Sequence, residues 1–221
     1  MSGAEKLLRE PWDGLGLSDE RALARQRAGA TFGIWIFLAS EVLFFGAIFL
    51  AYAVMRLEHA AAFAAAGRET NIVYGTLNSA ILLTSALCAA VASKSADHRD
   101  LRRTTLGCLA ATAALGLAFL AVKGLEYGED LGKHLVPGDS FPLHEPGAQL
   151  FFALYWFATG LHGIHLSIGI GLLARLLWKG WRDPEFLPGN PQVEVGLLYW
   201  GLVDIVWIFL FPLLYLPGRS G

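Results

Sequence analysis

Residues 148–174 read AQLFFALYWFATGLHGIHLSIGIGLLA, a stretch without a single Asp, Glu, Lys or Arg. An α-helix rises about 1.5 Å per residue, so roughly 20 apolar residues are enough to cross the hydrocarbon core of a membrane. Residues 71–93 and 104–122 are uncharged over similar lengths. Together, these three stretches predict a chain that is threaded repeatedly through a membrane.

Two more apolar stretches complete the pattern, so we expect an all-α integral membrane bundle of five transmembrane helices. The predicted helices cover about 31–55, 71–93, 104–127, 148–178 and 193–216, within a transmembrane domain at 31–217. A chain with 55% hydrophobic residues, 16% charged residues and a mean hydropathy of +0.48 fits this class. A net charge of −2, without a basic face interleaved with aromatics, excludes a nucleic-acid partner.

The first 30 residues are polar and contain no apolar stretch typical of a cleaved signal peptide. We expect residues 1–30 to form a cytoplasmic N-terminal segment, with a helix that begins near Ser18 and continues into the first span. Of the 17 Lys and Arg residues, 12 lie on the same side of the predicted membrane as this segment. Because basic flanks stay in the cytoplasm, the N-terminus is predicted inside and the C-terminus outside.

The longest loop of the predicted topology lies outside, from Glu126 to Pro146, and is acidic and rich in proline. We expect it to be an irregular surface segment. Gly163, Gly169 and Gly171 in the fourth span are expected to let neighbouring helices approach closely.

Polar residues deep in the spans are the candidates for function, because an ionisable group in hydrocarbon is costly and usually has a partner or a role. Glu41 lies roughly 15 Å into the first span and Asp204 roughly 14 Å into the last. His162 and His165 lie well inside the fourth span, three residues apart on one helix. We hypothesise that these four form one polar core, in which Glu41 serves either proton handling or hydrogen-bonded packing.

The histidine pattern does not favour a cofactor in this chain. A membrane cytochrome b needs axial histidines that face each other from different helices, but only His162 and His165 of the six histidines lie at depth, both on one helix. A zinc or copper site would need more ligands at that level than Glu41 and Asp204 supply. We therefore expect neither haem nor metal bound by this chain, and no catalytic residue.

Five stretches, taken in order, resemble subunit III of the haem-copper oxidases. They are WIFLASEVLFF at 35–45, LNSAILLTS at 77–85, KGLEY at 123–127, ATGLHGIH at 158–165 and VDIVWIFLF at 203–211. The first is similar to the family's helix with an embedded glutamate, and the fourth to its double-histidine element. The resemblance covers nearly all of the membrane region.

The resemblance implies a non-catalytic subunit of a proton-pumping terminal oxidase in the bacterial inner membrane. It implies packing on subunit I, with subunits II and IV nearby, and a cleft that holds phospholipid. In the family, the glutamate equivalent to Glu41 is associated with sustained proton uptake and with protection from inactivation during turnover, and the cleft is discussed as an oxygen route. The residues that the resemblance proposes for lipid binding are Trp35, Glu126, Tyr127, His162 and Trp207.

Two departures distinguish the chain from longer family members. Those have seven helices with a V-shaped lipid cleft, whereas this chain has five, and Gly201 stands where many relatives carry a histidine. The electron donor is either cytochrome c or quinol, and a partner subunit II with or without a binuclear copper site would distinguish them. The alternatives are an accessory subunit of a nitric oxide reductase, a stand-alone small transporter, or a small cytochrome b.

Overall fold

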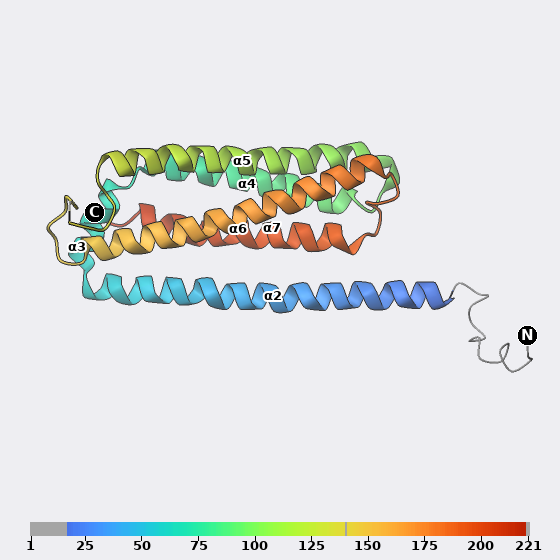
Figure 1. Ribbon diagram of the computed structural model, residues 1–221, viewed down its shortest axis with the longest axis horizontal. Coiled ribbons are helices and arrows are strands. Elements are labelled where there is room, and N and C mark those ends of the chain that lie inside the picture. Colours follow the sequence, from blue (N-terminus) through green and yellow to red (C-terminus); the bar gives the residue numbers. More distant parts are fainter. Residues whose placement is uncertain (1–16, 140, 220–221) are drawn as a thin grey trace, which may run out of the picture.

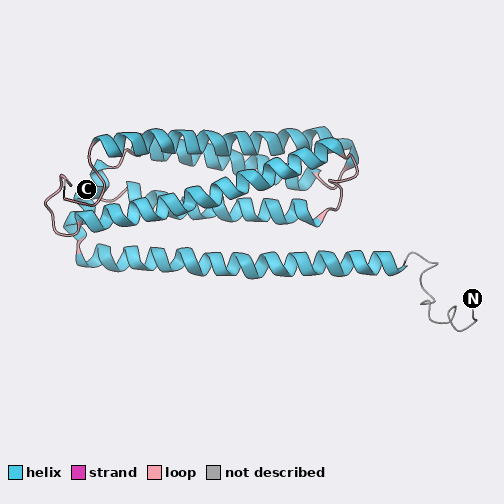
Figure 2. Ribbon diagram, in the orientation of Figure 1, coloured by secondary structure: helices cyan, strands magenta, loops and turns pink. Residues whose placement is uncertain are grey.

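The computed structural model describes residues 17–139 and 141–219, and within them the regular structure is helical (Figure 2). The long helices are α2 (Leu17–Glu58), α4 (Ile72–Ser95), α5 (Arg102–Gly132), α6 (Ala148–Arg182) and α7 (Pro191–Tyr215). Each contains an apolar stretch long enough to cross a membrane, which confirms the predicted five-span bundle. A short helix, α3 (Ala60–Glu69), and a 3₁₀ turn, Arg99–Leu101, lie between the spans.

The five long helices run side by side, with α2 along one edge of the bundle (Figure 1). α7 packs against α2, α4 and α6, and its residues are the most buried of the five spans. Two indoles hold it in place: Trp200 donates to Ser85 Oγ on α4 at 2.9 Å, and Trp207 donates to Ser79 Oγ on α4 at 3.1 Å. α7 therefore packs against three of the other four long helices, while α5 packs mainly on α4 and α6.

Close helix packing depends on two glycines that face Trp200. A Cβ added at Gly116 on α5 would lie 2.6 Å from the Trp200 ring, and one added at Gly169 on α6 would lie 2.9 Å from it. The predicted packing role is confirmed for Gly169. It is wrong for Gly163 and Gly171, where an added Cβ would meet nothing within 4 Å, because both positions face away from the neighbouring helices.

Two features near the end of α5 and at α3 differ from the sequence-based expectations. The loop predicted to begin at Glu126 begins later, because α5 continues to Gly132 and carries Glu126, Glu129 and Asp130 in helical conformation. α3 was not predicted; its Phe63 is fully buried and packs edge-on against Phe151 of α6, with ring centroids 5.4 Å apart.

The predicted N-terminal segment, residues 1–30, falls partly outside the described residues; from Leu17 onward it forms the start of α2. The helix thus begins one residue before the predicted Ser18. The start of α2 and the C-terminal end of α7 lie at opposite ends of the bundle (Figure 1), as an odd number of crossings requires.

Candidate functional site

Glu41 and His165 meet between α2 and α6. Glu41 Oε2 lies 3.1 Å from His165 Nε2, and both side chains are about 15% exposed. The other ring nitrogen of His165, Nδ1, lies 2.9 Å from the carbonyl oxygen of Leu161, which can only accept. Nδ1 therefore carries a hydrogen in this arrangement, and Nε2 faces the Glu41 carboxyl.

This contact is close but not aligned as a hydrogen bond, since Glu41 Oε2 has no partner that meets hydrogen-bond geometry among the described residues. The Phe45 ring lies edge-on to His165 at 5.3 Å and covers the pair from one side. Glu41 and His165 thus form a close, mostly buried pair of ionisable side chains between α2 and α6.

His162 points elsewhere, into the centre of the bundle. It is 1% exposed and lies between the rings of Phe119 at 5.5 Å and Trp207 at 5.2 Å. Its two ring nitrogens have no hydrogen-bond partner among the described residues. Positions three apart on a helix differ by about 60° in direction, which is enough for His165 to face α2 while His162 faces α5 and α7.

Asp204 lies apart from the other three residues of the hypothesised polar core. It is 5% exposed, and neither carboxylate oxygen has a hydrogen-bond partner among the described residues. It borders a groove between α4 and α7. The structure therefore brings Glu41 and His165 together, and it shows no hydrogen bond or ion pair that joins Asp204 or His162 to them within the described part of the chain.

A second polar cluster, which the sequence did not predict, lies near the end of α5. Lys123 Nζ contacts Glu126 Oε2 at 3.0 Å, Tyr155 OH at 3.0 Å and Tyr215 OH at 2.7 Å, so it uses its three hydrogens on three helices. The Lys123 side chain is 5% exposed and that of Glu126 is fully buried. This Lys123 cluster joins α5, α6 and α7.

Asp130 completes the Lys123 cluster through Tyr155. The Tyr155 hydroxyl lies 3.0 Å from Glu126 Oε1 and 2.7 Å from Asp130 Oδ2. Two carboxyls thus surround one ammonium, and the single phenolic hydrogen serves only one of them at a time. The signal in the sequence was the spacing of Lys123, Glu126 and Asp130 at i, i+3 and i+7, which places all three on one helix face.

The five residues that the resemblance proposes for lipid binding do not share one surface. Trp35 is exposed on α2, whereas Glu126, His162 and Trp207 are buried inside the bundle. Tyr127 is half-buried, and its hydroxyl lies 2.7 Å from Thr159 Oγ1 on α6.

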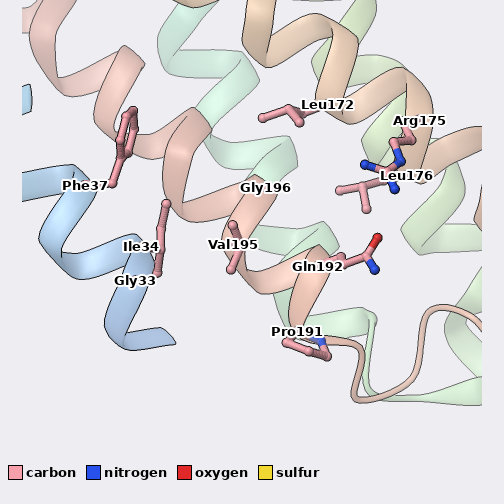
Figure 3. A pocket seen from close by; sticks show the side chains of 10 residues that line it. All are labelled: Gly33, Ile34, Phe37, Leu172, Arg175, Leu176, Pro191, Gln192, Val195 and Gly196. Atoms are coloured by element: carbon pink, nitrogen blue, oxygen red, sulfur yellow. The ribbon is translucent and has the colours of Figure 1, made fainter. Parts of the chain in front are cut away.

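A groove of about 530 Å³ lies between α2, α6 and α7 (Figure 3). Ile34 and Phe37 of α2 form one wall, and the polar groups of Arg175 on α6 and Gln192 on α7 lie on the opposite side. The remaining lining residues are Gly33, Leu172, Leu176, Pro191, Val195 and Gly196. An apolar slot with a guanidinium at one side fits a molecule with a hydrocarbon chain and an anionic head.

Within residues 17–139 and 141–219, no three His, Cys, Asp or Glu side chains come together in a way that could hold a metal ion. Cys88 and Cys108 are both free thiols.

Comparison with known proteins identifies the family. The family model of cytochrome c oxidase subunit III matches residues 20–219. The chain is 33% identical over 194 residues to a cytochrome c oxidase subunit 3 from Thermostichus vulcanus, covering 85% of this chain and 87% of that protein. It is 30% identical over 188 residues to a cytochrome bo(3) ubiquinol oxidase subunit 3 from Pseudomonas aeruginosa, covering 85% and 84%.

A third relative, from Aeropyrum pernix, is a heme-copper oxidase subunit I+III that is 31% identical over 194 residues, covering 83% of this chain and 22% of that longer protein. The family-model match extends over all five spans. The chain therefore belongs to the cytochrome c oxidase subunit III family, as a non-catalytic, multi-pass membrane member with five spans.

Proposed function

We propose that this chain is subunit III of a proton-pumping terminal oxidase in the bacterial inner membrane, where it packs on subunit I. The observation that carries the proposal is the family match over residues 20–219. The Aeropyrum pernix relative, whose name joins subunits I and III in one chain, supports direct contact between the two. Subunits II and IV complete the proposed assembly.

The surface of α2 supports a role inside a larger complex. Leu43, Leu50 and Leu57 are 75%, 66% and 84% exposed, and they continue a largely apolar face of a helix that packs only on one side. Lipid or a partner subunit must cover this face. We propose that Glu41 of α2, paired with His165 of α6, supports sustained proton uptake by the complex and has no catalytic role in this chain.

Purification of the tagged chain from membranes in mild detergent tests the assembly. We expect a haem-copper subunit I in stoichiometric amount, with haem absorption that belongs to that partner. The co-purified subunit II then identifies the electron donor, because a binuclear copper site indicates cytochrome c and its absence indicates quinol. Recovery of a nitric oxide reductase instead, or a stoichiometric Soret band from the isolated chain, would overturn the proposal.

We further propose that the groove between α2, α6 and α7 binds one phospholipid, with acyl chain against Ile34 and Phe37 and phosphate at Arg175. The support is the groove's shape and its single guanidinium (Figure 3). Lipid analysis of the purified complex should show one tightly bound phospholipid that Arg175→Leu removes. Arg103→Leu is the matched control, because Arg103 is exposed near the same end of the bundle and does not line the groove.

For the orientation, we propose that the start of α2 lies in the cytoplasm. At the same end of the bundle lie two stretches rich in basic residues, from Lys94 to Arg103 between α4 and α5 and from Arg175 to Arg182 at the end of α6. Labelling of single cysteines in intact cells checks this: a cysteine at Asp100 should stay unlabelled by an impermeant reagent, and one at Asp139 should be labelled. The reverse pattern would invert the topology.

A further inference from the structure

A second groove lies between α4 and α7, and small side chains form its α4 wall. It measures about 310 Å³ and follows α7 along Glu194, Leu197, Leu198, Gly201 and Asp204. The α4 wall consists of small side chains: Ala86, Ala89, Ala90 and Ser93. Small residues at spacings of three and four allow the backbone of another transmembrane helix to approach closely.

Asp204 gives this α4/α7 groove a chemical preference. Asp204 is 5% exposed and lines the groove, and both of its carboxyl oxygens are buried without a hydrogen-bond partner among the described residues. An uncompensated carboxyl at this depth is costly in hydrocarbon. A donor on a partner helix that reaches Asp204 through the groove in the assembled state would remove this cost.

Glu194 lies in the same groove, near the start of α7. It comes ten residues before Asp204 and so lies roughly 15 Å from it along the helix. The groove thus presents two acids at two depths, and its other lining residues carry no charge. A hydrocarbon chain would fill the space but leave Asp204 without a donor. A helix with a basic side chain at mid-membrane depth satisfies both the shape and the charge.

We propose that the α4/α7 groove is the docking site for a transmembrane helix of the partner subunit, and that this helix brings an arginine or lysine to Asp204. The inference rests on the proposed function, since it names the face of this chain that meets its partner in the oxidase. The row of groove residues continues along α7 to Ile208, which is 52% exposed and available for the same contact.

Photo-crosslinking in the purified complex tests the position. A photoreactive residue at Ala90, inside the groove, should give adducts with one transmembrane helix of the partner that contains a basic residue. The same probe at Leu117 on α5 or Ile164 on α6, which are 57% and 58% exposed, serves as the control for other faces and should give few partner adducts.

Two substitutions at Asp204 separate docking from folding. Asp204→Leu should reduce the partner captured by the tagged chain by about tenfold, and Asp204→Asn should reduce it less, because the amide oxygen still accepts a hydrogen bond. The isolated Asp204→Leu chain should unfold at the same temperature as the wild type or higher, since an uncompensated buried carboxyl has been removed.

The outcomes distinguish this inference from the proposed function. If the wild-type chain captures no haem-copper subunit, the proposed function fails. If it captures the subunit, but Asp204→Leu captures equally well, or the Ala90 adducts fall on lipid, on a second copy of this chain or on a helix without a basic residue, the docking inference alone is overturned.

Discussion

At the scale of single residues, the Lys123 cluster shows that a charge in a membrane span can be structural. Lys123 serves as a donor to Glu126, Tyr155 and Tyr215, and its single positive charge lies near two carboxyls. Its ammonium also lies 4.5 Å from the centre of the Tyr155 ring, where cation–π attraction adds to the hydrogen bonds. Removing such a charge leaves its partners buried and uncompensated, which costs more than the pair itself contributes.

We therefore expect Lys123→Met to lower the free energy of unfolding by about 3–5 kcal/mol. Asp130→Asn should cost only about 1 kcal/mol, because it removes one of two negative charges that face a single ammonium. Lys133→Met is the control, since Lys133 pairs with Glu129 on a half-exposed surface where ion pairs contribute little. Denaturant unfolding in detergent measures all three, and equal losses for Lys123 and Asp130 would contradict this account.

The Glu41–His165 contact makes a prediction of coupling. In a double-mutant cycle with Glu41→Gln and His165→Ala, we expect a coupling energy of about 0.5–2 kcal/mol. The matched cycle with His162→Ala should be additive, because His162 faces α5 and α7. Coupling of Glu41 to His162 but not to His165 would show that His162, and not His165, contacts Glu41.

At the scale of helices, the bundle depends on where glycine meets Trp200. Gly116→Ala should destabilise the fold by about 1–3 kcal/mol, because the added methyl group overlaps the Trp200 ring. Gly124→Ala on the same helix should leave stability unchanged or raise it slightly, since nothing lies within 4 Å of the added atom and alanine favours a helix over glycine. Thermal unfolding of the two variants checks the contact between Gly116 and Trp200. Equal unfolding temperatures for the two variants would contradict this contact.

At the scale of the whole molecule, one prediction concerns turnover. In the assembled oxidase, Glu41→Gln should leave assembly and the initial rate of dioxygen reduction near the wild-type level and shorten the period of activity before inactivation. The physical reason is that glutamine keeps the volume of Glu41 but cannot take up a proton beside His165. Progress curves of oxygen consumption by purified complexes provide the measurement. An unchanged time course would leave Glu41 a packing residue.

Much of this architecture could be predicted from residues 17–219 because membrane insertion is decided locally. Each span needs only its own run of apolar side chains and its own backbone hydrogen bonds, so the five helices followed from composition. The limits are at the helix ends: the sequence predicts that the third span ends near residue 127, yet α5 continues through Asp130 to Gly132. Burial against Tyr155, contributed by a distant part of the chain, stabilises that last stretch as a helix.

The sequence by itself determined the five membrane spans, the family and the depth of Glu41, His162, His165 and Asp204. Only the tertiary structure decided which of them meet: His165 faces Glu41, His162 lies among aromatic rings, and Asp204 opens on the α4/α7 groove. The reason is geometric. Depth follows from counting residues along one helix, whereas partnership depends on how each helix is rotated about its axis, and that rotation is fixed by contacts such as Trp200 against Gly116 and Gly169.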